Sequence, residues 1–154
     1  MVTDTGGVND RSFNASAWAG MQAAKSKNSA ISVEYVQSTA ESDYTPNLNS
    51  FVQKKCDLIV AVGGLMGDAT TTAAKANTSQ KFAIVDDKID LPNVYSMQFD
   101  TAQAAYLAGY LAAGMSKTGV VGTYGGAKIG PVTIFMDGFV EGVAQYNKVH
   151  SKSV

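Results

Sequence analysis

Four side chains near the start of the chain have the types that hold a small polar ligand. Asp10, Ser12, Phe13 and Asn14 all lie within the stretch TDTGGVNDRSFN. Carboxylate, hydroxyl and amide groups donate and accept hydrogen bonds, and an aromatic ring offers a flat face for stacking. The combination suits a ligand that has a planar ring and polar substituents.

The same residues have purely structural interpretations. Ser12 can cap the helix that follows it. Phe13 can pack into the core on the same helical stripe as Ala17. Asn9 and Asp10 can shape an Asx-type turn. From the residues alone, the ligand-binding and structural interpretations both stay open.

A further acidic residue, Asp86, closes the stretch KFAIVDD. A carboxylate at the end of a strand can accept two hydrogen bonds from a ligand while it remains ionised. In the alternative interpretation, Asp86 and Asp87 only form a solvated turn. Gly63 and Gly64 end another apolar run. In one interpretation they bring the backbone near a cleft; in the other, they are needed only because the backbone there has a positive φ.

Catalysis and metal binding find little support in the sequence. The only cysteine is Cys56, and the only histidine, His150, stands in a polar tail. No nucleophile has an adjacent base, and TDTGGVND lacks the spacing of a G-x-G-x-x-G dinucleotide motif. We therefore predict no catalytic residues, no metal ligands and no cofactor.

The composition excludes further classes of function. The chain has 154 residues, of which 45% are hydrophobic and 16% charged, enough for one domain or slightly more. A net charge of -1 provides no basic field for nucleic acid, which we exclude as a partner. We expect no membrane span and no signal peptide in this chain, since neither a long apolar run nor a charged-then-apolar leader stands out.

Apolar, β-branched runs alternate with segments of helical period along the whole chain, which is typical of a doubly wound α/β fold with a parallel sheet. The unbroken apolar run Leu58–Val62 predicts a central strand. Helix 101–115 is so apolar that we expect it to be nearly buried, with Gly109 permitting close packing. The further predicted strands are 1–4, 31–35, 81–87, 94–99 and 119–126. The further predicted helices are 12–27, one that begins near Asp43 or Thr45, one along Ala69, Ala73 and Ala76, and 132–143.

Five stretches carry a resemblance to a known family. They are VTDTGGVNDRSFNASAWAGM, CDLIVAVGG, KFAIVDD, AAYLAGYLAA and GGAKIGPVTIFMDGFVEGV. In order and spacing, the chain resembles the basic membrane protein (BMP) family, substrate-binding lipoproteins of bacterial ABC transporters similar to purine nucleoside receptor A. The resemblance covers residues 2–145.

The resemblance implies a type I periplasmic-binding-protein-like fold, in which two α/β lobes close on a ligand. Family members are about twice this length, so we expect an N-terminal fragment: residues 1–115 as the first lobe, and 116–154 as the hinge and incomplete start of the second. Asp10, Ser12, Phe13 and Asn14 match the family's ligand-facing motif. Asp86 is favoured over Asp87, and Phe13 is the candidate stacking ring.

The implied function is capture of a nucleoside, with a purine nucleoside favoured, for delivery to an ABC-transporter permease. The intact parent is then extracytoplasmic and lipid-anchored. Binding of another small, sugar-like signal and a nucleoside-processing enzyme are the alternatives. For the chain itself we expect self-association and weak or absent nucleoside affinity, because only one wall of the cleft is complete.

Overall fold

The computed structural model describes all residues from 1 to 154, which form two compact units, residues 1–98 and 99–154. The division precedes helix α4 (Thr101–Met115), whereas the sequence predicted a boundary after residue 115. The physical reason is that α4 packs along helix α5 (Gly130–His150) and forms a helical hairpin with it. Each unit is described by itself below.

The first unit contains a four-stranded parallel sheet of β1 (Val2–Thr3), β2 (Leu58–Val62), β3 (Lys81–Val85) and β4 (Val94–Met97), in the order β1-β2-β3-β4. The strand predicted at 31–35 does not form. Instead Val36 makes a single parallel bridge to Val2, with Thr3 N donating to Val36 O at 3.1 Å. β1 therefore has a parallel neighbour on each side, Val36 on one and β2 on the other.

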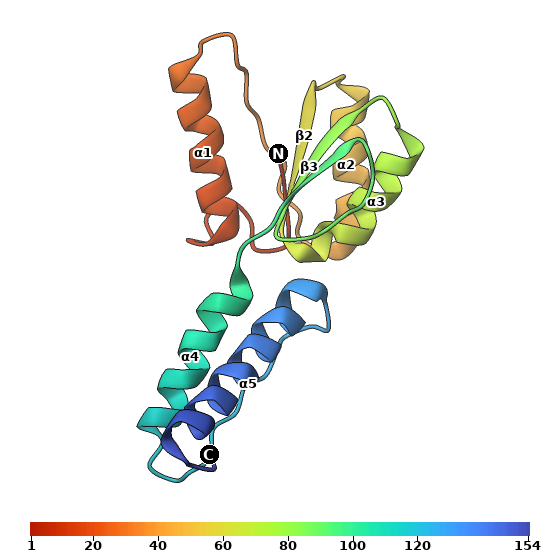
Figure 1. The fold of residues 1–154 in the computed structure, drawn as a ribbon. Helices are drawn as coiled ribbons and strands as arrows, with labels where there is room; N and C mark the ends of the chain where they lie inside the picture. Colours follow the sequence, from red (N-terminus) through yellow and green to blue (C-terminus); the bar gives the residue numbers. More distant parts are fainter. The chain divides into compact units, whose positions relative to one another are not determined.

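Helices cover the two faces of this sheet, as the predicted α/β class requires. α1 (Phe13–Lys27) lies on one side, and α2 (Tyr44–Gln53) and α3 (Gly67–Ala76) lie on the other (Figure 1). Two single-turn 3₁₀ helices, η1 (Glu41–Asp43) and η2 (Gly64–Met66), precede α2 and α3.

The core lies mainly between the sheet and α2 and α3. Its largest buried side chains are Leu48, Phe51, Ile59, Phe82 and Ile84. Alternate residues of β2 and β3 point into this layer, because side chains along a strand alternate between its faces. Burying an apolar side chain of this size contributes about 1.5–3 kcal/mol to the free energy of folding. The core therefore holds in place the sheet whose edge forms the candidate site.

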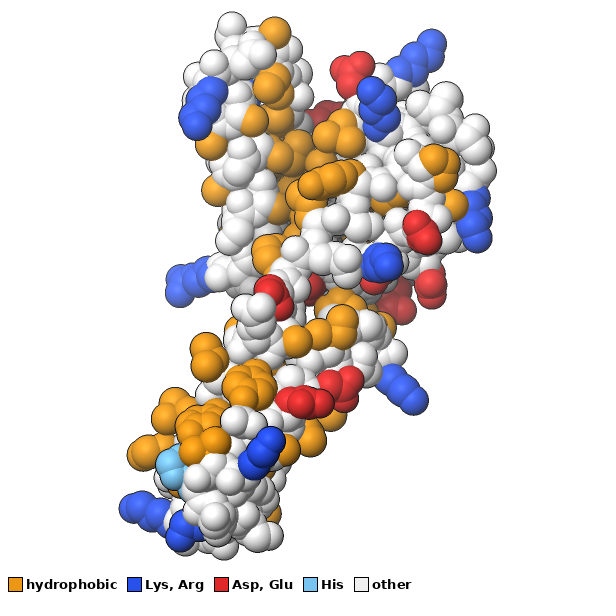
Figure 2. All heavy atoms as spheres, in the orientation of Figure 1, with side chains coloured by type: hydrophobic (Ala, Val, Ile, Leu, Met, Phe, Trp, Pro, Cys, Tyr) orange, Lys and Arg blue, Asp and Glu red, His pale blue; other side chains and the backbone are white.

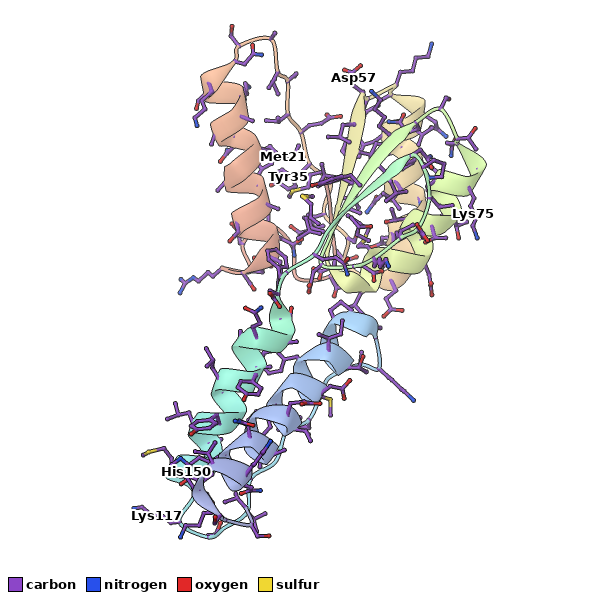
Figure 3. The ribbon with its side chains drawn as sticks, viewed as in Figure 1. Met21, Tyr35, Asp57, Lys75, Lys117 and His150 are labelled. Carbon is purple, nitrogen blue, oxygen red and sulfur yellow. The ribbon has the colours of Figure 1, made fainter.

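On the opposite side, α1 contacts the segment that follows it. The rings of Trp18 and Tyr35 pack edge to face with centroids 4.9 Å apart. Met21 on α1 and Tyr35 both lie on this side of the sheet (Figure 3). An aromatic contact of this geometry adds about 0.5–1.5 kcal/mol to the burial of the rings, and it helps hold α1 beside the sheet.

The second unit is the α4–α5 hairpin, whose buried residues are all small: Ala105, Gly109, Ala113, Gly138 and Gly142. A Cβ at Gly109 would overlap the carbonyl oxygen of Phe139. The close packing predicted at Gly109 is therefore present. The two backbones approach so closely because no side chain larger than a methyl group stands between them.

Two other predictions for this unit are wrong. α4 is not nearly buried, since Leu107 and Leu111 on its far side remain 68% and 64% exposed. Residues 119–126 form no strand, because a strand requires a neighbouring strand to take its backbone hydrogen bonds. Where α5 ends, the Tyr110 hydroxyl and His150 Nε2 are hydrogen-bonded at 3.0 Å, and His150 is labelled in Figure 3. None of the helices combines the length and apolarity needed to cross a bilayer.

Candidate functional site

The candidate site lies in the first unit, along the edge where the parallel strands end. β1 is followed by the loop that leads to α1, β2 by Gly63, and β3 by Asp86. The connection that leaves β1 runs through α1 on one face of the sheet, and the connection that enters β2 runs through α2 on the other face (Figure 1). In open α/β sheets, ligands bind in the crevice at such a switch point, outside the carboxyl ends of the strands.

Two carboxylates and one amide form a hydrogen-bonded network at this edge. Asn14 Nδ2 donates to Asp4 Oδ1 at 2.7 Å and to Asp10 Oδ2 at 3.0 Å. Asp4 Oδ1 also accepts a hydrogen bond from Gly6 N at 2.9 Å. The end of β1 is thereby tied to the first turn of α1.

The network fixes which way the Asn14 amide points. Its nitrogen must face the two carboxylates, because an amide oxygen there would meet only acceptors. Asn14 is 1% exposed, and its Oδ1 has no hydrogen-bond partner. A buried acceptor without a partner costs about 1–3 kcal/mol, and Oδ1 is enclosed by the protein.

Asp10 caps helix α1. Its carboxylate accepts hydrogen bonds from the backbone N–H groups of Ser12 at 2.8 Å, Asn14 at 3.0 Å and Ala15 at 3.0 Å. Partial desolvation acts to raise the pKa of Asp10, but the hydrogen bonds from Ala15, Ser12 and Asn14 outweigh it and lower the pKa below its ordinary value. The Asx-type structural role predicted for Asp10 is present, alongside any contact with a ligand.

We expect the substitution Asp10→Ala to destabilise the first unit by about 1 kcal/mol at neutral pH, since α1 loses its cap. A carboxyl with a depressed pKa in the folded state contributes stability above its unfolded pKa of about 3.9, and this contribution disappears as the pH falls through the folded value. Urea unfolding at pH 7, 5 and 3 measures both effects, with the exposed Asp57→Ala as the matched control. A deficit that persists unchanged at pH 3 would contradict the capping role.

Ser12 and Phe13 do not adopt their alternative structural roles. Ser12 stands at the N-cap position of α1, yet its side chain makes no capping hydrogen bond, because Asp10 supplies the acceptor. Phe13 is 44% exposed and is not part of the buried core. Both side chains are thus accessible at the start of α1, and their contact with a ligand stays a prediction.

Asp86 lies at the same edge of the sheet but two strands away from β1, with β2 between them. Its backbone has a left-handed φ of 67°, and its N–H donates to Met97 O at 2.9 Å. Burial raises the pKa of Asp86, and the charge of Asp87 raises it further. Asp87 instead turns toward α3, where one of its carboxylate oxygens contacts Gly67. Asp86 and Asp87 therefore occupy different surroundings.

Sequence reasoning missed Asp4 and underrated Gly63. Gly63 has a φ of 105°, and a Cβ there would lie 2.7 Å from Asp4 Oδ2. The glycine is therefore needed both for its backbone conformation and for the space that the Asp4 carboxylate occupies. The signal that identified Asp86, an acidic residue directly after a strand, also applies to Asp4. No group of three or more His, Cys, Asp or Glu side chains is arranged to hold a metal ion.

Comparisons with known proteins show which family and which solved structures the chain is similar to. A family model described as ABC transporter substrate-binding protein PnrA-like (Bmp) matches residues 1–153. The "CD4+ T-cell-stimulating antigen" of Listeria innocua is 43% identical over 152 residues, covering 96% of this chain and 43% of the relative. The "ABC transporter nucleoside-binding protein BmpA" of Lactococcus lactis is 44% identical over 146 residues, or 92% of this chain and 42% of the relative.

Solved structures give the same result for the fold. An ABC transporter solute-binding protein from Aeropyrum pernix K1 matches with a TM-score of 0.81 and 28% identity, over 99% of this chain and 44% of that one. A putative lipoprotein fragment from Peptoclostridium difficile 630 matches 75% of this chain with a TM-score of 0.59. The chain thus spans less than half the length of the curated relatives described above.

Proposed function

We propose, since the chain belongs to the Bmp family of PnrA-like ABC transporter substrate-binding proteins, that it forms one wall of a nucleoside-binding cleft, with purine nucleosides as the favoured ligands. The observation that carries the proposal is the network of Asp4, Asp10 and Asn14 beside the exposed ring of Phe13. The name of the Lactococcus lactis relative, a nucleoside-binding protein, points to the same class of ligand.

The charges of this edge favour a neutral nucleoside over a nucleotide. Phosphate groups bind the free N–H groups of a helix N-terminus. In α1, three of these groups donate to the Asp10 carboxylate. Asp4 and Asp86 add carboxylates to the same edge of the sheet. A phosphate would therefore meet like charges and occupied donors, whereas ribose hydroxyls and ring N–H groups would find acceptors.

The spacing of the acidic residues suits a ligand with two polar ends. Neighbouring strands lie about 4.8 Å apart, so the ends of β1 and β3 are separated by roughly 10 Å. A nucleoside is of that length, with hydroxyls on its sugar and heteroatoms on its base. In this arrangement Phe13 stacks on the base, and Asp86 binds one polar end while Asn14 and its neighbours bind the other.

The complete protein is proposed to be a binding protein and no enzyme. Its second lobe closes on the nucleoside, and the closed form delivers it to the permease of an ABC transporter. Relatives named as lipoproteins in Pyrococcus abyssi and Pyrococcus horikoshii support an extracytoplasmic, lipid-anchored location. The division into lobes is proposed to follow the two compact units, with α4 belonging to the second lobe.

The test is calorimetric titration of a full-length protein carrying these residues. We expect guanosine, adenosine or inosine to bind, and the corresponding 5′-monophosphates to bind at least tenfold more weakly. Ribose and other sugars serve as the comparison for a sugar-like ligand, and chromatography of the mixture detects any free base. Heat from sugars alone, or release of free base, would contradict the proposal.

The ring of Phe13 supplies a second, residue-level check. We expect Phe13→Ala to weaken nucleoside binding by about 1–3 kcal/mol, as for other aromatic side chains that stack on bases. Phe13→Leu keeps an apolar side chain of similar size, so it separates stacking from burial. Equal affinities for wild type and both variants, measured by the same titration on folded protein, would show that the ring does not contact the ligand.

A further inference from the structure

The carboxylate of Asp10 has no acceptor position left for a ligand. Its Oδ1 accepts hydrogen bonds from Ser12 N at 2.8 Å and from Ala15 N at 3.0 Å. Its Oδ2 accepts hydrogen bonds from Asn14 N at 3.0 Å and from Asn14 Nδ2 at 3.0 Å. An ionised carboxylate offers about four lone-pair sites, and these bonds from its own loop and helix occupy them. Asp10 is therefore satisfied before any ligand arrives.

Asp4, the other acid of the network, is bonded differently. Its hydrogen bonds from Gly6 N at 2.9 Å and from Asn14 Nδ2 at 2.7 Å both go to Oδ1. Its Oδ2 accepts no hydrogen bond and lies beside Gly63, where an added Cβ would come within 2.7 Å of it. The two carboxylates of one network thus differ in what they can still bind.

Asp10 takes the place of Ser12 as the cap of α1. Ser12 stands at the N-cap position, and a serine there ordinarily accepts a hydrogen bond from the backbone N–H two or three residues further on. Those two groups, Asn14 N and Ala15 N, donate to Asp10 instead. The exposed Ser12 hydroxyl is left without a capping hydrogen bond.

A free hydroxyl differs from the other polar groups at this edge. Figure 2 shows acidic side chains on the side of the first unit where its strands end, and ionised carboxylates only accept hydrogen bonds. The Asn14 amide already donates to Asp4 and Asp10. A purine base, however, carries ring nitrogens that need a donor. The Ser12 hydroxyl can supply one, because a hydroxyl both donates and accepts.

We propose that Asp10 makes no contact with the ligand and is a positioning residue, which caps α1 in place of Ser12 and so keeps the Ser12 hydroxyl free to bind the nucleoside. The inference rests on the proposed nucleoside site and divides its loop by role. Ser12 and Phe13 contact the ligand, and Asp10 acts on the ligand only through them. This role differs from the ligand contact that the family motif implies for Asp10.

Calorimetric titration of a full-length protein carrying these residues tests the absence of contact. We expect Asp10→Asn to weaken guanosine, inosine and adenosine by the same factor, roughly three- to tenfold, the cost of ordering one or two side chains. The 2′-, 3′- and 5′-deoxy forms of inosine should show that factor too, because no hydroxyl of the ligand bonds to Asp10. Asp57→Asn removes the same charge at an exposed position before β2 and is the matched control, with unchanged affinity.

The analogues also show how the proposal would fail. A loss of affinity that disappears with one analogue would reveal a hydrogen bond between Asp10 and the missing group, and would overturn the proposal. An unchanged affinity in Asp10→Asn would overturn it as well. If the wild-type protein binds no nucleoside, the proposed function itself fails, and this inference with it.

A cycle of single and double variants tests the exchange of caps without a ligand. Ser12→Ala should leave the urea midpoint of the 154-residue chain unchanged, because the hydroxyl makes no capping bond, and it should still weaken nucleoside binding in the full-length protein. In an Asp10→Ala background the hydroxyl can cap α1. There we expect Ser12→Ala to lower the folding equilibrium constant about fivefold, as loss of a serine cap does. A loss of that size with Asp10 present, or no loss in either background, would contradict the exchange.

Discussion

Asn14→Asp is expected to destabilise the first unit by about 3 kcal/mol or more at pH 7. The substitution keeps the size of the side chain but replaces the donor Nδ2 by an acceptor. Three carboxylates, those of Asp4, Asp10 and the new residue, would then face one another at a position that is 1% exposed. Buried acceptors that lose their donor, together with like charges in contact, rank among the most costly single changes.

The pH dependence separates this explanation from a simple loss of packing. Protonation of the carboxyls removes the repulsion and restores a donor, so the deficit in the free energy of unfolding should shrink between pH 7 and pH 4. Urea unfolding at both pH values measures it. Asn9→Asp adds the same charge at an exposed position of the same loop, and should change stability by less than about 0.5 kcal/mol. Equal effects of the two substitutions would contradict the network.

Gly109→Ala is expected to destabilise the hairpin by about 2 kcal/mol. The added methyl group would overlap the Phe139 carbonyl oxygen and would lie 2.8 Å from its carbonyl carbon and 3.0 Å from its Cα. These atoms belong to the backbone of α5 and cannot rotate away, so the two helices must separate. Because the overlap is with backbone atoms, the overpacking cost lies at the upper end of its usual range, about 3 kcal/mol. The helix-propensity gain of about 1 kcal/mol from replacing glycine by alanine offsets part of it.

Gly20→Ala is the matched control, because Gly20 lies in α1 and an added Cβ meets no atom within 4 Å. Here only the propensity term remains, and we expect a stabilisation of about 0.5–1 kcal/mol. Thermal unfolding followed by circular dichroism compares the two variants. A Gly109→Ala protein more stable than wild type would show that the hairpin backbones do not approach as closely as described.

Much of the first unit follows from its sequence pattern. Leu58–Val62 is an uninterrupted apolar run, and in Lys81–Val85 every residue after Lys81 is apolar; both segments form strands of the parallel sheet. The pattern is strong because both faces of these strands are covered. The predicted helices at 12–27 and 101–115 also form, with Phe13 and Thr101 as their first helical residues.

The parts that could not be predicted depend on distant partners. The alternating residues 31–35 have the pattern of a strand, yet only Val36 bridges to Val2. Residues 119–126 have it too, but no neighbouring strand pairs with them. In the candidate site, the sequence indicated the loop residues but not Asp4, because its contact with Asn14 depends on how α1 folds back onto the end of β1. Local periodicity contains no information on such long-range pairing.

The hydrogen bonds that tie Asp4, Asp10 and Asn14 together also affect the entropy of binding. An interface side chain that must be immobilised by its ligand costs about 0.5–1.5 kcal/mol of affinity. Here Asn14 is already held by two carboxylates, and Asp10 by the first turn of α1. A ligand that binds at this edge meets a preorganised surface. In the proposed binding protein, the ordering cost then falls outside this loop, which is already in place when the ligand arrives.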